Sequence, residues 1–335
     1  MGAGLLGARH ARAYSELPEC HLVAVCDLDL RRAEDVAARY GASAFANLGE
    51  MLGAGVEAVS VATPDHVHCV PVAACLDAGA HVMVEKPLTI DPGEARMLIA
   101  KAHEMRRVLM VNYSQRWLPE HRRIEALQLD GTLGDVVFVE SHRWDAAWVP
   151  GRMIAGWAAH TTPIHFMSSH DIDLILHWTG RRVRSVYAGS HRGALPQQGV
   201  IDGVDALLSL DGGARVSLHS SWILPETFPA AADTRLEVLG SRAGLFLDGN
   251  ARTLRLFTPE RSESITFAGP RTADEAQGRL AGAFVESLRA FVSAIASGDR
   301  TAPTSAARTL HVVEVQAAIL ASAEHGRVVE LQHGG

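Results

Sequence analysis

The sequence predicts an α/β protein in two parts. The first is a doubly wound parallel sheet with helices on both faces, and the second is built around a largely antiparallel sheet. In the first third of the chain, short apolar runs alternate with amphipathic segments of roughly 10–15 residues, as in βαβ units. After about residue 180, runs of alternating polarity follow one another, separated in places by Asp-Gly turns. The length of 335 residues also suits about two domains of ~150 residues.

Four strands and four helices are expected in the first part. The first helix ends before Pro18, and the second ends at Gly41, a residue type favoured directly after helices. The expected strands cover residues 21–27, 56–63, 81–85 and 108–112. The expected helices cover residues 8–17, 30–40, 64–78 and 92–105.

The second part has a different order of elements, with helices mainly near its two ends. The expected helices cover residues 120–129, 168–178, 275–297 and 305–324. The expected strands cover residues 136–142, 183–190, 204–210, 214–221, 234–239, 244–247 and 254–257. A boundary near 116–119 divides the chain into a first domain, 1–117, and a second domain, 118–335.

The composition excludes several classes of protein. Hydrophobic residues make up 47% and charged residues 21% of the chain, which are values of a globular protein. The net charge of -7 provides no basic field for nucleic acid or an anionic membrane. No apolar run approaches the ~18 residues of a membrane span. Four cysteines without a C-x-x-C pair suit a reduced, cytoplasmic protein.

A glycine-rich motif, Gly2-Ala3-Gly4-Leu5-Leu6-Gly7, opens the first helix. Glycines at this spacing let the backbone approach a pyrophosphate, which then lies at the helix N-terminus. Asp27 closes the next strand about 20 residues further on, where a carboxylate bonds the hydroxyls of a ribose. An acidic side chain there repels a 2′-phosphate, so we expect NAD and disfavour NADP.

The motif lacks the strand that normally precedes it, because the first glycine directly follows Met1. That strand would be central in the sheet, and its loss would leave unpaired backbone on both neighbours. We therefore expect the native chain to begin several residues upstream of Met1.

Two further motifs follow predicted strands, at the sheet edge where ligands of such folds bind. They are Ala62-Thr63-Pro64-Asp65-His66-Val67-His68 and Glu85-Lys86-Pro87. A lysine beside a cationic nicotinamide ring can bond a substrate hydroxyl and stabilise charge as a hydride leaves.

Together these residues resemble the Gfo/Idh/MocA oxidoreductases. The resemblance extends over the whole chain and rests on GAGLLGARHARAY, Asp27, ATPDHVHCVPVAACLDAGAHVMVEKPLTID, NYSQRW, the turn Gly131-Thr132-Leu133-Gly134, and SSHDIDLILHWTG. It implies a Rossmann domain, then an α/β domain whose open, mostly antiparallel sheet makes a homodimer or homotetramer interface. It also implies NAD(P)-dependent oxidation or reduction of a sugar, polyol or sugar derivative.

The resemblance also implies roles for individual residues. Lys86 matches the catalytic lysine, and His170 matches the general acid/base on the reacting hydroxyl. A capped or core histidine is the alternative for His170. The residues expected at the cofactor are Gly2, Gly4, Leu5, Leu6, Gly7, Asp27, Thr63, Pro64, His68, Glu85, Lys86, Asn112 and Arg116.

Phe166 departs from the family pattern, because many members have an aspartate four residues before the histidine. A phenylalanine cannot accept a proton or orient an imidazole, so no Lys–Asp–His trio is available. Phe166 itself, His165, Asp171 and Trp144 are candidates for contacts with substrate. We expect no metal, because histidines at 160, 165 and 170 do not match metal-ligand spacing on a helix.

Two alternatives to a dehydrogenase stay open. One is a glycoside hydrolase of the same family that retains NAD and uses it transiently. The other is a non-catalytic nucleotide-binding paralogue, which Phe166 and the absent first strand would favour.

Overall fold

The computed structural model describes residues 1–195 and 199–331, and it divides into two compact units. Unit 1 comprises Met1–Leu118 and Gly269–Val313, and unit 2 comprises Pro119–Ala268 and Glu314–Gly335. The first division between the units follows Leu118, and residues 269–313 pack with the N-terminal unit. The expected domains, 1–117 and 118–335, stay a prediction.

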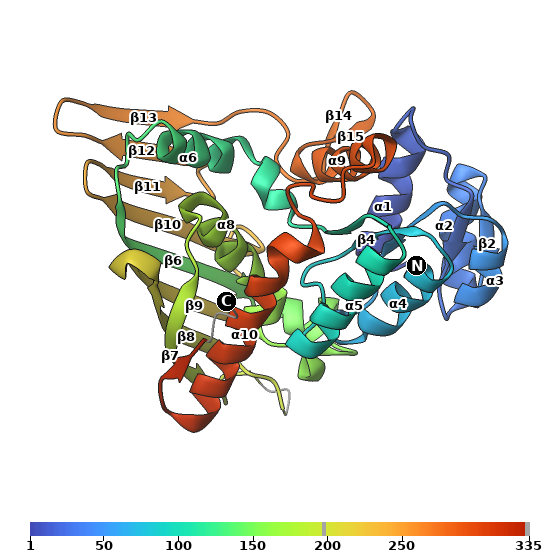
Figure 1. Ribbon diagram of the computed structural model, residues 1–335, viewed down its shortest axis with the longest axis horizontal. Coiled ribbons are helices and arrows are strands. Elements are labelled where there is room, and N and C mark those ends of the chain that lie inside the picture. The colour runs from blue at the N-terminus through green and yellow to red at the C-terminus, as the bar shows by residue number, and fades with distance from the viewer. Residues whose placement is uncertain (196–198, 332–335) are drawn as a thin grey trace. The chain divides into compact units, whose positions relative to one another are not determined.

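The strands in the first segment of unit 1, Met1–Leu118, are parallel, as expected for a Rossmann domain (Figure 1). They form two short sheets: β1 (Ala24–Cys26) with β2 (Ser43–Phe45), and β3 (Ala58–Val61) with β4 (His81–Val84) and β5 (Leu109–Val111).

The first residues of the chain lie between these two sheets. The Gly2 amide donates to the Cys26 carbonyl at 2.8 Å, and the Met1 amino group donates to the Ser60 carbonyl at 2.8 Å. Residues 1–2 thus lie between β1 and β3 and form backbone hydrogen bonds with both sides. The expectation of a start upstream of Met1 stays a prediction.

Helix α2 of unit 1 begins and ends at recognisable caps. Asp29 accepts a hydrogen bond from the Arg31 amide at the start of α2, and Gly41 closes the helix in a left-handed conformation with φ 68°. The helices are α1 (Leu5–Glu16), α2 (Leu30–Tyr40), α3 (Leu48–Gly53), α4 (Cys69–Asp77), α5 (Pro92–Glu104) and α9 (Ala283–Ser297), with 3-10 turns at Asp65–Val67 and Ser114–Trp117.

The expected helix at 275–297 is shorter than predicted. Its first turns form a hairpin of β14 (Asp274–Ala276) and β15 (Arg279–Ala281), and α9 begins only at Ala283. Gln277 and Gly278 between the strands have φ 53° and 76°, the left-handed geometry of a two-residue hairpin turn.

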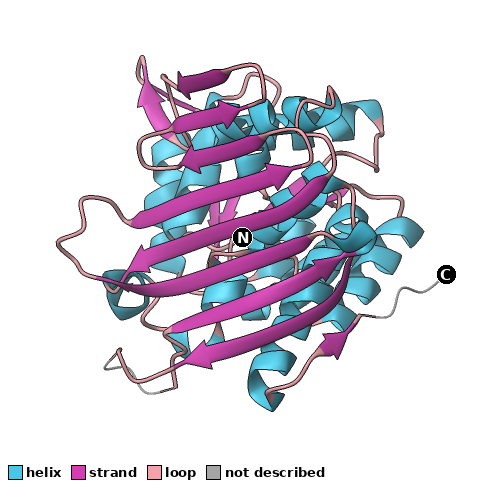
Figure 2. Ribbon diagram, turned by 90° about the vertical axis from the view of Figure 1, so that its left-hand side faces the viewer, coloured by secondary structure: helices cyan, strands magenta, loops and turns pink. Residues whose placement is uncertain are grey.

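Unit 2 contains a nine-stranded sheet in the order β13-β12-β11-β10-β6-β9-β8-β7-β16 (Figure 2). All its pairs are antiparallel except β6 with β9, so the mostly antiparallel sheet is confirmed. The strands are β6 (Val136–Ala146), β7 (Val183–His191), β8 (Gly203–Leu210), β9 (Arg215–Leu224), β10 (Ala232–Gly240), β11 (Gly244–Asp248), β12 (Thr253–Phe257), β13 (Ser262–Thr266) and β16 (Val329–Glu330).

One face of this sheet is covered by helices of the same unit, and the opposite face is open (Figure 2). The helices are α6 (Pro119–Leu129), α7 (Pro163–Phe166) and α8 (Ser169–Thr179), with a short π-helical segment at Val149–Met153 and a 3-10 turn at Ala158–His160. The remaining helix, α10 (Ala306–His325), contains the last division between the units. Among the described residues, no helix has the length and apolar character needed to cross a membrane.

Candidate functional site

The glycine motif forms a close-packed turn at the N-terminus of α1. A Cβ atom on Gly7 would lie 1.7 Å from the Gly2 carbonyl oxygen, and one on Gly2 would lie 2.7 Å from the Ala62 carbonyl oxygen. Both positions therefore need glycine for packing.

Gly4 differs, because a Cβ atom there would meet nothing within 4 Å. It is the N-cap of α1, and no capping side chain binds the first amides of the helix. A pocket of about 350 Å³ lies beside it. Its lining residues are Ala3, Gly4, Leu5, Ala8, Arg32, Asp35, Val36 and Arg39. This open space at the positive end of the α1 dipole, which a side chain at position 4 would fill, is called the glycine cradle below. It fits a pyrophosphate.

Asp27 lies against this turn. Its carboxylate accepts hydrogen bonds from the Ala3 amide at 2.7 Å and from the Asp29 amide at 2.9 Å. The structure therefore brings the acidic residue and the glycine motif together, as the spacing predicts.

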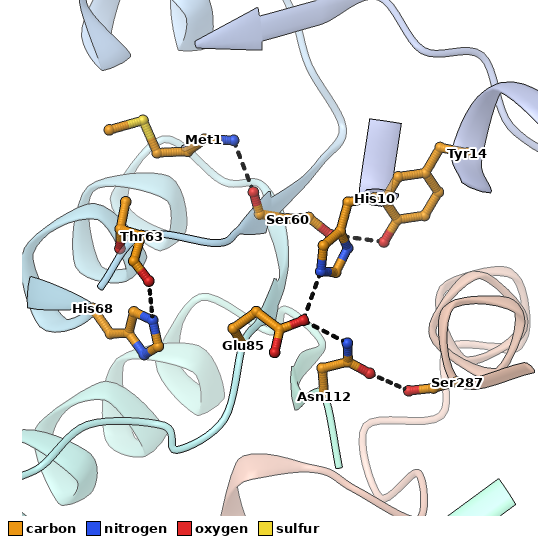
Figure 3. Close-up of polar contacts among 9 residues, drawn as sticks. All are labelled: Met1, His10, Tyr14, Ser60, Thr63, His68, Glu85, Asn112 and Ser287. Carbon is orange, nitrogen blue, oxygen red and sulfur yellow. Dashed lines mark hydrogen bonds and ion pairs between the residues drawn. The ribbon is translucent and has the colours of Figure 1, made fainter. Parts of the chain in front are cut away.

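The buried ring of His68 contacts the segments that follow β3 and β4 (Figure 3). Its Nε2 contacts the Thr63 carbonyl at 2.9 Å, and its Nδ1 contacts the Pro87 carbonyl at 2.8 Å. Burial lowers the pKa of His68, although both carbonyls and the nearby Asp65 act in the opposite direction. The Thr63 hydroxyl is buried without a hydrogen-bond partner in the described structure, which suits a residue that binds a ligand.

Glu85, at the end of β4, is the centre of a buried polar network (Figure 3). Its Oε1 accepts hydrogen bonds from His10 Nε2 at 2.8 Å and Asn112 Nδ2 at 2.7 Å. The Ser287 hydroxyl donates to Asn112 Oδ1 at 2.7 Å. Burial alone would raise the pKa of Glu85, but the bonds from His10 and Asn112 and the charge of Lys86 together lower it.

Lys86 follows Glu85 in the turn after β4 and is partly buried. Arg116 lies in the 3-10 turn after β5, where its guanidinium donates to the Pro303 carbonyl at 2.6 Å. The strand ends of unit 1 thus bring together Thr63, His68, Glu85 and Asn112, while Arg116 binds the backbone of the later segment of the same unit.

In unit 2, His170 is the second residue of α8 and is partly buried. The next residue, Asp171, forms two hydrogen bonds of 2.8 Å with Arg143. Phe166 contacts the rings of Trp157 and Trp222, at centroid distances of 5.8 and 6.1 Å. Position 166, where many members of the family have an aspartate, is therefore part of an aromatic cluster in this protein.

The structure does not bring Trp144 together with these residues. Side chains alternate along β6, so Arg143 faces α8 and Trp144 lies on the opposite face of the sheet. There Trp144 stacks on His142 at a centroid distance of 4.3 Å. His165 is buried in the short helix α7.

The sequence reasoning missed His10 and Ser287. Both lie on the buried faces of their helices, His10 three residues before Ala13 and Ser287 three residues after Phe284. A polar side chain at a helical position otherwise occupied by apolar residues was the available indication, because buried polar groups need partners.

The parallel sheet, the glycine cradle and the strand-end network define a Rossmann-type dinucleotide-binding oxidoreductase. The chain belongs to the Gfo/Idh/MocA family. Residues 1–113 match the model described as "Oxidoreductase family, NAD-binding Rossmann fold", and residues 121–246 match the family's C-terminal domain.

Similar proteins align over nearly the whole chain. The inositol 2-dehydrogenase 1 of Saccharopolyspora erythraea is 29% identical over 349 residues, covering 99% of this chain and 95% of the relative. The crystal structure of UDP-N-acetylglucosamine 3-dehydrogenase from Acidithiobacillus ferrooxidans has a TM-score of 0.81 and 26% identity, covering 97% and 96% of the two chains. The structure of GenD2 from gentamicin A biosynthesis, in complex with NAD, has a TM-score of 0.80 and 26% identity, covering 99% and 95%.

Proposed function

We propose that this protein is an NAD-dependent dehydrogenase that oxidises a hydroxyl group of a sugar, a polyol or a sugar derivative, or reduces the corresponding carbonyl. The observation that supports this most directly is in unit 1. There the open cradle at Gly4 and the polar network around Glu85 occur in one unit of parallel strands. The substrate class is supported by the relatives named for inositol and for a UDP-sugar.

The residues of unit 1 would hold the two halves of the cofactor. The amides after Gly4 would bind the pyrophosphate, and Asp27 would bond the ribose hydroxyls on the adenine side. Thr63 and Glu85 would bind the nicotinamide half, and His68, whose ring nitrogens contact backbone carbonyls, would hold the strand ends that line it. NAD supplies a ring carbon that accepts a hydride when bound there.

Lys86 and His170 would handle the charge and the proton of the substrate. The ammonium of Lys86 would donate a hydrogen bond to the reacting oxygen and stabilise the negative charge that develops on it. His170 would accept the hydroxyl proton through a ring nitrogen. Phe166 provides neither an acid nor a base, so no carboxylate at that position would share the task.

A thermal-shift titration with NAD+, NADH, NADP+ and NADPH tests the cofactor. A ligand at ~100 times its dissociation constant stabilises the folded state by about 2.7 kcal/mol. We expect a shift of a few degrees with NAD+ and NADH and a smaller one with the phosphorylated pair. Equal shifts with all four would contradict the role of Asp27.

A screen of inositols, sugars and nucleotide sugars, followed by the absorbance of NADH, tests the reaction. Lys86→Ala and His170→Ala should each lower turnover by a factor of about 100 or more, the usual contribution of a positioned acid–base group. Unchanged turnover in Lys86→Ala would remove the lysine from the mechanism. NAD that stays bound through cycles of glycoside cleavage would favour the hydrolase instead.

We also propose that two or more copies associate through the open face of the sheet in unit 2. Exposed apolar side chains from five strands lie on that face, namely Tyr187, Leu207, Ile223, Leu239 and Phe257. Patches of this kind on a sheet mark interaction surfaces. The four free cysteines are consistent with a reducing compartment, and we propose the cytoplasm.

A further inference from the structure

Four elements of unit 1 contribute to one buried chain of hydrogen bonds (Figure 3). It runs from Ser287 in α9 to Asn112 after β5, then to Glu85 after β4, and ends at His10 in α1. The exposed fractions are 0% for Ser287, 2% for Asn112, 5% for Glu85 and 3% for His10. Water therefore does not compete for these bonds.

The direction of each bond follows from the groups involved. A carboxylate only accepts hydrogen bonds, so the Asn112 NH2 group and a protonated His10 Nε2 face Glu85. The Asn112 oxygen then faces Ser287, whose hydroxyl must donate. If the Asn112 amide rotated by half a turn, its oxygen would face the carboxylate. Ser287 opposes that rotation because it offers a donor to the oxygen.

The two donors both bind Oε1 of Glu85, at 2.8 and 2.7 Å. Oε2 receives no hydrogen bond from the described residues. Unlike the buried polar atoms without a partner, it is not fully buried. Oε2 is therefore the oxygen of Glu85 that remains open to a ligand.

We propose that Ser287 and His10 are positioning residues, which hold Glu85 in a single orientation so that Oε2 accepts a hydrogen bond from a hydroxyl on the nicotinamide half of bound NAD. This inference rests on the proposed function. It extends the cofactor site to α9, a helix from the later part of the sequence, and to the middle of α1.

Ser287→Ala tests the proposal, with Ser293→Ala as the matched control, because Ser293 lies in the same helix and is exposed. Isothermal titration with NAD+ and with ADP separates the two halves of the site, since ADP lacks the nicotinamide ribose. We expect Ser287→Ala to weaken NAD+ binding about tenfold, the effect of one hydrogen bond of ~1.4 kcal/mol, and to leave ADP binding within about twofold. Ser293→Ala should leave both affinities unchanged.

His10→Leu and His10→Gln test the other end of the chain. Leucine removes the donor to Glu85, whereas glutamine can still donate from its amide. The pH below which NAD+ binding fails should rise in His10→Leu, because Glu85 then keeps only the Asn112 donor and protonates more easily. It should return most of the way to normal in His10→Gln. A purely structural effect would lower the melting temperature without moving this pH.

Two outcomes overturn the proposal. The first is equal NAD+ affinity in Ser287→Ala and Ser293→Ala, together with an unmoved acid limit in His10→Leu. The second is a parallel loss of NAD+ and ADP binding in Ser287→Ala. If the unaltered protein itself fails to bind NAD+, the proposed function fails as well, so the two failures are distinguishable.

Discussion

Replacing Arg143 by methionine would break the buried ion pair next to His170. The side chains of Arg143 and Asp171 are 11% and 9% exposed, and two hydrogen bonds of 2.8 Å join them. Burial opposes the charge of Arg143, but Asp171 and then Asp145 raise its pKa. Removing one partner of such a pair leaves an uncompensated charge and costs about 3–5 kcal/mol. We expect a loss of this size from Arg143→Met and a smaller one from Asp171→Asn, because Asp145 remains near the arginine.

Urea unfolding followed by tryptophan fluorescence measures these losses, since five of the six tryptophans lie in unit 2. The double variant Arg143→Met/Asp171→Asn removes both charges. Its loss of stability should be at least about 2 kcal/mol smaller than the sum of the single losses, which is a coupling expected of direct contacts. Losses that add to within about 0.5 kcal/mol would refute the reasoning, because independent sites behave in that way.

Three further predictions follow from the structure. Gly4→Ala should leave the melting temperature unchanged and weaken NAD+ binding about tenfold or more. Gly7→Ala should lower the melting temperature, because its Cβ would lie 1.7 Å from the Gly2 oxygen. A lower melting temperature in Gly4→Ala would contradict this reasoning. The pKa of Glu85 is lowered on folding, so its contribution to stability is present above its ordinary value of 4.5 and lost as the pH falls through the folded-state pKa. The free energy of unfolding, measured at pH 6 and at lower pH, should therefore depend less on pH in Glu85→Gln than in the unaltered protein. An identical pH dependence in the two proteins would contradict this. Leu207→Glu, on the open sheet face, should convert oligomers to monomers in light scattering, and an unchanged mass would place the interface elsewhere.

Much of the N-terminal fold could be predicted because the local patterns agree with the tertiary structure. Helix α2 begins at Leu30 and ends at Tyr40, as predicted, since its cap residues Asp29 and Gly41 are local features. The short elements β2 and α3 were missed, because three- and six-residue segments contain too few positions to show a period. The hairpin before α9 was missed for another reason. Its turn depends on the left-handed conformation of Gln277, a residue type with no preference for it.

The candidate site was only partly predictable. Glu85 and Asn112 belong to motifs that the resemblance identified, and their hydrogen bond joins them in the structure. Ser287 belongs to no motif, and His10 lies within GAGLLGARHARAY but was assigned no role there. Their role depends on contacts between segments 75 and 175 residues apart, which periodicity within a single helix cannot indicate. The same limit applies to Trp144, whose face of the sheet depends on the register of β6.

The discontinuity of unit 1 affects the order in which a newly made chain can mature. Ser287 is supplied 175 residues after its partner Asn112, and the later segment of unit 1 extends to Val313. A ribosome must therefore complete nearly the whole polypeptide before the nucleotide-binding half can reach its final arrangement. Prematurely terminated products would contain the glycine motif but lack α9. Such products would leave Asn112 without the Ser287 donor that fixes its amide, so incomplete chains would compete poorly with finished ones for the cofactor.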